Sequence, residues 1–215
     1  MSPPAAAATA RHSHDARRRQ AAARRRRSVL FLGAFGLLLL AVVLAIPLFK
    51  KAVNDLGLPL QDQDIIRQQA QEKHLDPALI AAVIYAETKF DPRPSPAGAQ
   101  GLMQILPETA DFLARRSGAT TFTPADLATP QVNIAYGSYY LRYLLDSYGG
   151  DTMLALAAYN GGQANVDRWV ADARAHGHRL TAAEIPFPET RAYVAKVLQA
   201  QKDYRRTYPS ELGYQ

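Results

Sequence analysis

Glu87 is the acidic residue whose position in the sequence best suits acid–base chemistry. The pair Asp76-Pro77 predicts a helix start, because aspartate caps free N–H groups and proline fits the first helical position. Over residues 78–88, three apolar side chains and Glu87 recur at i, i+3, i+4 and i+7, which places Glu87 on the core-facing side. Burial disfavours an ionised carboxylate, so we expect a raised pKa, as a proton donor near neutral pH requires. The alternative is a frayed helix end that leaves Glu87 in water.

The elements that must position Glu87 are also predicted to be helices. One helical pattern covers residues 64–73, and a second covers residues 130–148 and ends at a Gly-Gly pair. A third, over residues 152–160, is capped by Asp151 and ends at another Gly-Gly pair. No convincing strand alternation is found. The sequence therefore predicts an all-α domain over residues 64–208.

The N-terminal part of the chain differs in charge and hydropathy. Residues 1–27 contain eight arginines and one aspartate, a charge of +7, which leaves −1 for the rest of a chain whose formal charge is +6. Without apolar periodicity, this tail is expected to be disordered. Residues 28–49 carry no charge, and at about 1.5 Å per residue they are long enough to cross a bilayer core of about 30 Å. Residues 50–63, with a glycine and a proline, are predicted to be a linker.

The distribution of basic residues predicts how this apolar segment is oriented. Many arginines precede it and only Lys50 and Lys51 follow it closely, so the positive-inside rule places the N-terminus in the cytoplasm. The expected protein is single-pass in the cytoplasmic membrane, with everything after residue 50 extracytoplasmic. A cleaved signal peptide or a buried helix are the alternatives.

Several other chemistries find no support in the sequence. The absence of cysteine excludes a disulfide framework, a thiol nucleophile and a lipid-modified cysteine. The run His176-Gly177-His178 has no accompanying carboxylate cluster or HExxH motif, so no metal or other cofactor is expected. Three further acidic residues could serve as second carboxylates but are interpreted as turn or first-turn residues: Asp91, Glu108 and Asp126.

Four strings of residues occur in an order that is typical of one enzyme family. They are Glu87-Thr88-x-Phe90, Ser95-Pro96-Ala97-Gly98-Ala99-Gln100-Gly101-Leu102-Met103-Gln104, Ala158-Tyr159-Asn160-Gly161-Gly162 and Pro186-Phe187-Pro188-Glu189-Thr190-Arg191-x-Tyr193-Val194. Together they resemble the lytic transglycosylases of the soluble-transglycosylase (SLT) type, over residues 60–205. The resemblance implies a lysozyme-like α-helical domain that cleaves the β-1,4 bond between N-acetylmuramic acid and N-acetylglucosamine in peptidoglycan.

The resemblance also implies roles for individual residues. Glu87 matches the catalytic acid/base and Gln104 the amide that binds the sugar near the scissile bond. Other matched positions line or shape the glycan groove: Ser95, Met103, Tyr159, Asn160, Glu189 and Tyr193. Two departures from the family pattern occur. Thr88 stands where serine is usual, and the stretch from Glu87 to Ser95 is about one residue shorter than the pattern.

The implied chemistry needs only one protein carboxylate, whereas ordinary glycosidases use two. The muramoyl 6-hydroxyl is the nucleophile, so no water takes part. Glu87 would first protonate the leaving glycosidic oxygen and then accept the proton of the attacking hydroxyl, which leaves a 1,6-anhydromuramoyl end.

Three other functions are weighed against this one. A goose-type lysozyme-like hydrolase would share the fold, and a glycan-binding protein with a degenerate site would share the groove. The Arg-rich tail could bind nucleic acid, but it lacks interleaved aromatic residues and precedes a membrane segment, so it is assigned to topology and anionic lipid. The expected partners are peptidoglycan glycan strands and the cytoplasmic membrane, and cell-wall or secretion machinery are candidate protein partners.

Overall fold

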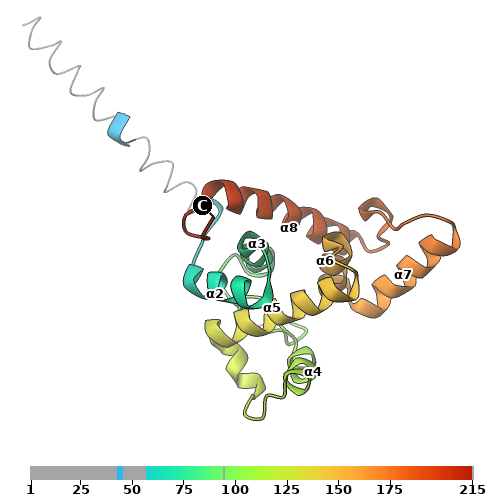
Figure 1. The fold of residues 1–215 in the computed structure, drawn as a ribbon, viewed down its shortest axis with the longest axis horizontal. Helices are drawn as coiled ribbons and strands as arrows, with labels where there is room; N and C mark the ends of the chain where they lie inside the picture. The colour runs from blue at the N-terminus through green and yellow to red at the C-terminus, as the bar shows by residue number, and fades with distance from the viewer. Residues whose placement is uncertain (1–42, 46–56, 94, 215) are drawn as a thin grey trace, which may run out of the picture. The chain divides into compact units, whose positions relative to one another are not determined.

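The computed structural model describes residues 43–45, 57–93 and 95–214, and Figure 1 shows a helical arrangement for them. No strand occurs among these residues, and the one β-type pairing that they contain is an isolated antiparallel bridge between Gln100 and Ile105. The predicted all-α class is therefore confirmed for this part of the chain. In chain order the elements are α2 (Gln63–Lys73), α3 (Pro77–Glu87), α4 (Pro107–Ser117), η1 (Pro124–Ala128), α5 (Pro130–Ser147), α6 (Thr152–Gly161), α7 (Gln163–Ala175), η2 (Ala182–Glu184) and α8 (Pro188–Thr207).

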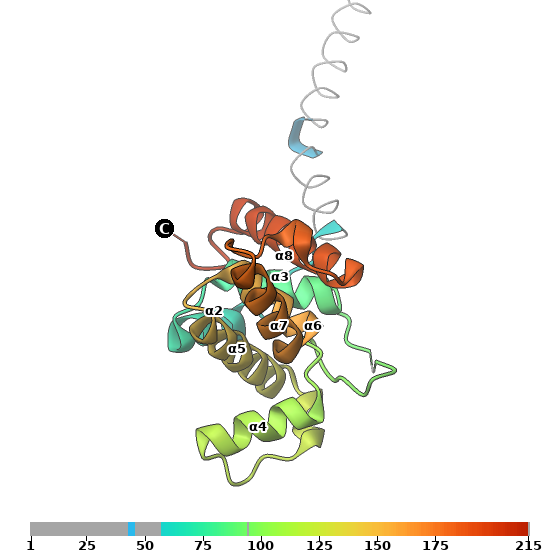
Figure 2. The same ribbon diagram turned by 90° about the vertical axis from the view of Figure 1, so that its right-hand side faces the viewer.

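Helix α3 lies in the core of the folded unit. As predicted, the Asp76 carboxylate accepts a hydrogen bond from the Ala78 N–H at 3.0 Å, and Pro77 occupies the first turn. All of residues 78–84 are buried, which is more than the single apolar stripe inferred from the spacing. The reason is that both α2 and α8 pack against α3 (Figures 1 and 2), so most of its circumference faces protein.

Helix α5 links this core to the smaller elements. It ends at Ser147, before the Gly-Gly pair, and α6 begins after Asp151, whose carboxylate accepts from the Leu154 N–H at 3.2 Å. Both boundaries were predicted and are confirmed. Helix α5 packs against α2 and α6, and α6 packs in turn against α7 and α8. Helices α4 and η1 lie on the opposite side of α5 from α8 in both views (Figures 1 and 2).

The folded unit extends beyond the predicted domain boundaries at both ends. Before α2, the Leu58 carbonyl accepts a hydrogen bond from the Tyr208 hydroxyl at 2.8 Å. After α8, the Tyr214 hydroxyl donates to the Asp76 carboxylate that caps α3. Residues 57–62, assigned to a linker from the sequence, are therefore attached to the domain by long-range hydrogen bonds that local composition does not reveal.

The predicted tail and the predicted membrane segment lie outside the described residues, except for residues 43–45, which are helical and exposed. Within the part of the chain that the structure describes, no helix has the length and hydropathy needed to cross a bilayer. Disorder of residues 1–27 and membrane insertion of residues 28–49 thus stay predictions.

Candidate active site

Glu87 is the last residue of α3 and lines a pocket of about 500 Å³. Its side chain is half-buried, and burial raises its pKa from the ordinary 4.5 to about 7. The Tyr193 hydroxyl and the Lys196 ammonium lower this pKa, whereas the Glu189 charge adds to the rise. Because the burial effect is the largest, Glu87 is held near half protonation at neutral pH, and the alternative of a fully hydrated Glu87 does not hold. A group that must both donate and accept a proton needs this balance.

Two tyrosines from different helices lie beside the Glu87 carboxyl. Tyr193 of α8 is 8% exposed, and its hydroxyl is close enough to lower the Glu87 pKa, although the two groups are outside standard hydrogen-bond geometry. Tyr159 of α6 donates from its hydroxyl to the Met103 carbonyl at 2.9 Å. Burial, followed by the Glu87 charge, raises the pKa of both hydroxyls well above the ordinary value. Both tyrosines therefore stay neutral and can act as hydrogen-bonding groups but not as bases.

The loop that precedes α4 is fastened to the core by Asn133 of α5, which is fully buried. The Asn133 Oδ1 accepts from the Met103 N–H at 2.7 Å. Its Nδ2 donates to the carbonyls of Gln100 and Leu127, at 2.8 and 3.1 Å. Gly101 has a φ of +72°, and a Cβ there would lie 2.1 Å from the Asn133 Nδ2. Glycine is therefore needed at this position for both its conformation and its lack of a side chain.

Thr88 and Gln104 also hold this loop in place. Thr88 links it to the end of α3, and Gln104 links it to the segment around Arg93. The Thr88 hydroxyl donates to the Leu102 carbonyl at 2.9 Å, so the hydroxyl retained at this position links α3 to the loop. Gln104, with a φ of +48°, donates from Nε2 to the carbonyls of Gly101 and Arg93, at 2.9 and 3.0 Å. No described residue donates to its Oε1. Gln104 thus braces the loop with its amino group and leaves its oxygen available at the pocket that it lines.

Ser95 and Met103, also singled out from the sequence, occupy different surroundings. Ser95 lines the Glu87 pocket, and its Oγ accepts from the Ala99 N–H at 2.9 Å. The Met103 side chain has no exposed surface and packs against Gly137 of α5, where a Cβ would lie 2.4 Å from the Met103 sulfur. Met103 is therefore placed to support the site through its packing and its backbone rather than through contact with a ligand.

The remaining two predicted residues lie where α6 ends and α8 begins. Asn160 is exposed, and its Oδ1 accepts from the Thr190 hydroxyl at 2.8 Å. Glu189 is an exposed acidic residue in the first turn of α8, and its charge acts on Glu87. The structure therefore brings residues of three distant strings close to Glu87, namely Ser95 and Gln104, Tyr159, and Glu189 and Tyr193, with Asn160 next to Tyr159 at the end of α6.

Three residues of the site were not recognised from the sequence. Asn133 and Thr190 are buried polar residues that hold the loop and Asn160, and Lys196 donates from Nζ to the Ala86 carbonyl at 2.7 Å beside Glu87. Asn133 could have been found, because it lies four residues before Gly137 on the buried face of α5. The partners of Thr190 and Lys196 lie far away in the sequence, so no local sequence pattern predicts these contacts.

The other acidic residues differ in their relation to this pocket. Asp126 accepts from the Thr123 N–H at 2.8 Å and Glu108 lies in the first turn of α4, as predicted for both. Asp91 is exposed and pairs with Arg93 at 2.6 Å, but it also lines the Glu87 pocket. The described residues contain no group of three or more histidine or acidic side chains that could hold a metal ion.

Comparison with known proteins defines the class to which this helical domain belongs. The family model described as "Transglycosylase SLT domain" matches residues 64–181, more than half of the chain. The chain belongs to this family.

Among individual relatives, the soluble lytic murein transglycosylase of Escherichia coli (strain K12) is 33% identical over 150 residues, which are 68% of this chain and 23% of that protein. A putative soluble lytic murein transglycosylase of Haemophilus influenzae is 33% identical over 147 residues, 66% of this chain and 24% of that protein. The chain therefore spans about a quarter of the length of these relatives.

Solved structures agree with this assignment. An inactive mutant of the lytic transglycosylase Slt from Pseudomonas aeruginosa superposes with a TM-score of 0.67 and 31% identity, over 73% of this chain and 26% of that one. The 70 kDa soluble lytic transglycosylase from Escherichia coli gives a TM-score of 0.65 and 31% identity, over 71% of this chain and 25% of that one. The predicted lysozyme-like transglycosylase fold is thus supported by sequence and by structure.

Proposed function

We propose that this chain cleaves the β-1,4 bond between N-acetylmuramic acid and N-acetylglucosamine in peptidoglycan without using water. The observation that carries the proposal is Glu87, half-buried in a pocket with a pKa of about 7, at the acid/base position of the family motif. A carboxyl group with this pKa can supply a proton at neutral pH and can take one back in the next step. The proposed reaction needs no cofactor.

In the first step, protonated Glu87 donates its proton to the glycosidic oxygen, and the bond between that oxygen and the muramoyl anomeric carbon breaks. In the second step, the muramoyl 6-hydroxyl oxygen bonds to the anomeric carbon and its proton passes to the Glu87 carboxylate. The acetamido group of the sugar stabilises the positive charge between these steps. Glu87 is protonated again at the end, and the product carries a 1,6-anhydro ring.

The groups around Glu87 support both of its protonation states. Burial and the Glu189 charge favour the acid, whereas the Tyr193 hydroxyl and Lys196 favour the carboxylate. We assign the binding of the glycan to the pocket-lining Ser95 and Gln104, the exposed Asn160 and Glu189, and the two tyrosines beside Glu87, Tyr159 and Tyr193, with Met103 as a support behind them.

A hydrolase is the second candidate function, because Asp91 lines the same pocket as Glu87. In an inverting glycosidase, a second carboxylate activates a water on the far side of the sugar. Asp91 carries the second carboxyl group of this pocket and pairs with Arg93 at 2.6 Å, so it is the candidate for such a base. Under the transglycosylase proposal, Asp91 has no part in the chemistry.

The two functions are separated by variants assayed on purified peptidoglycan sacculi. Glu87→Gln keeps the shape of the side chain but removes the transferable proton, so release of fragments should fall by about 10²–10⁴. Glu108→Gln, which changes an exposed acid in the first turn of α4, is the matched control and should retain full activity. Asp91→Asn should retain most of the activity, and its complete loss would favour the hydrolase.

We also propose that residues 28–49 anchor the protein in the cytoplasmic membrane, with residues 1–27 in the cytoplasm and the catalytic domain facing the cell wall. The uncharged run of residues and the arginines that precede it support this proposal. An alkaline phosphatase fused after Gln215 should be active, and the mature protein should retain its N-terminus. An inactive fusion would contradict the topology, and a mature chain that begins near residue 50 would contradict the anchor. Cell-wall or secretion machinery would then be accessible partners.

A further inference from the structure

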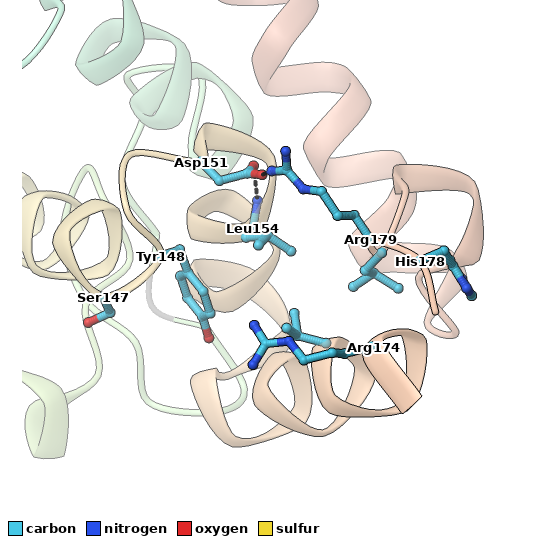
Figure 3. A pocket seen from close by; sticks show the side chains of 9 residues that line it. Ser147, Tyr148, Asp151, Leu154, Arg174, His178 and Arg179 are labelled. Carbon is cyan, nitrogen blue, oxygen red and sulfur yellow. Dashed lines mark hydrogen bonds and ion pairs between the residues drawn. The ribbon is translucent and has the colours of Figure 1, made fainter. Parts of the chain in front are cut away.

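A second pocket, of about 280 Å³, shares no lining residue with the Glu87 pocket. It lies where the end of α5, the start of α6, α7 and the segment after α7 meet, as Figure 3 shows. Asp151 at its edge and Tyr159, which lies beside Glu87, are eight residues apart, a rise of about 12 Å along α6. The side chains that line it are Ser147, Tyr148, Asp151, Leu154, Val170, Arg174, His178, Arg179 and Leu180.

The charge in this pocket is unbalanced. Arg179 pairs with Asp151 at 3.0 Å, and the same carboxylate caps α6. Arg174 extends from the last turn of α7 towards Tyr148 (Figure 3), and no described residue forms a hydrogen bond or an ion pair with its guanidinium. His178 interacts with Glu184 outside the pocket, at 3.0 Å. Among the described residues that line the pocket, Asp151 offsets Arg179, which leaves the positive charge of Arg174, and the Asp167 carboxylate that binds the Tyr148 hydroxyl is outside the lining.

The rest of the lining is suited to a small apolar group. Leu154, Val170 and Leu180 supply aliphatic surface, and the Tyr148 side chain is held in place by donating to the Asp167 carboxylate at 2.8 Å. A planar guanidinium binds a carboxylate through two parallel hydrogen bonds. The single positive charge of Arg174 neutralises one carboxylate, whereas a phosphate dianion would keep one negative charge without a partner. The volume is at the small end for ligand sites, which suits one residue at the end of a chain rather than a polymer segment.

We propose that this pocket binds the C-terminal residue of a peptide, with the terminal carboxylate on Arg174 and a short aliphatic side chain against Leu154, Val170 and Leu180. Arg174 and Arg179 are exposed, so the rest of the peptide can leave the pocket into solvent. If the proposed function holds, the peptides attached to peptidoglycan strands are such ligands, and the pocket would hold a strand at the start of α6, whose other end carries Tyr159 beside Glu87.

The test uses the full chain in neutral detergent and N-acetyl-alanyl-alanine as the probe, followed by saturation-transfer NMR titration. We expect a dissociation constant on the order of 1 mM, because one charged pair and a small apolar contact are involved. The C-terminal amide of the same dipeptide should bind at least about tenfold more weakly. Isobutyrate and inorganic phosphate, the probes for a free acid and for a phosphate ligand, should also bind more weakly.

Variants assign the binding to this pocket. Arg174→Gln should weaken binding of the dipeptide about tenfold or more, and Arg174→Lys should have an intermediate effect because it keeps the charge but loses the planar pair of donors. Arg168→Gln on the same helix removes an equal charge outside the pocket and should leave binding unchanged. Fluorescence of Trp169 checks that each variant is folded.

Equal binding of the dipeptide and its amide, or unchanged binding by Arg174→Gln, would overturn the proposal. Tighter binding of phosphate would overturn the carboxylate assignment, and equal binding of isobutyrate would overturn the peptide assignment. None of these results bears on Glu87, because binding is measured without cleavage.

Discussion

Replacing Glu87 with glutamine should stabilise the folded domain, and the gain should grow with pH. Burial raises the pKa of Glu87 from 4.5 to about 7. A folded-state pKa above the unfolded value means that the stability contributed by this group is complete below about pH 4.5 and is lost as the pH rises through about 7. At about 1.4 kcal/mol per pKa unit, the full loss is about 3 kcal/mol by pH 8 and less than about 1 kcal/mol at pH 5. Glutamine carries no charge that burial could destabilise, so the free energy of unfolding of the variant does not fall in this way as the pH rises.

The measurement is urea unfolding of the full chain in neutral detergent at pH 5 and pH 8, followed by the fluorescence of Trp169. This is the single tryptophan of the chain, and it is buried in α7, so its signal reports the folded domain. Glu108→Gln, an exposed acid on α4, should show no comparable change between the two pH values. A gain for Glu87→Gln that is equal at both pH values, or below about 1 kcal/mol at pH 8, would refute a buried and destabilised carboxyl.

Three further outcomes are expected. The kcat/KM for glycan cleavage should fall about tenfold per pH unit above about pH 7, as the Glu87 proton is lost, and a flat profile to pH 9 would contradict this role. Asn133→Leu removes the acceptor of the Met103 N–H and the side-chain donor to the Gln100 and Leu127 carbonyls, of which the first keeps the Ile105 N–H, so the free energy of unfolding in urea should drop by about 2–4 kcal/mol, and a drop under about 0.5 kcal/mol would show that the loop is held in another way. Gln104→Ala should weaken chitooligosaccharide binding by about 1–3 kcal/mol and also lower stability by about 1 kcal/mol, because its amino group braces the loop; unchanged affinity by calorimetry would remove Gln104 from the site.

The features predicted correctly from the sequence are those with local causes. The Asp76 and Asp151 caps and the Gly-Gly stop after α5 are short-range chemistry, and the structure confirms each. The raised pKa of Glu87 also followed from local spacing. A carboxyl at the end of a buried helix loses hydration whichever helices pack around it, so its pKa could be predicted without knowing the tertiary contacts.

The features that the sequence could not predict depend on contacts between distant residues. Asn133 and Met103 are joined across 30 positions, and Tyr159 and Met103 across 56, so no periodicity within one helix reveals these links. The same limit explains why α3 was assigned one buried face when it is enclosed by α2 and α8. The bonds from the Gln104 amino group to the carbonyls of Gly101 and Arg93 likewise depend on how the loop folds, which the sequence pattern does not specify.

Mass spectrometry of the fragments released from purified sacculi by the full chain distinguishes attack by the muramoyl 6-hydroxyl from attack by water. Attack by the muramoyl 6-hydroxyl gives muropeptides that end in a 1,6-anhydro ring, each one water lighter than the hydrolysed product. We predict that these anhydro species dominate the wild-type digest, that digestion in ¹⁸O-labelled water introduces no label, and that Glu87→Gln releases neither form. Reducing, ¹⁸O-labelled ends as the main product would contradict the proposed transglycosylase reaction and identify the chain as a hydrolase.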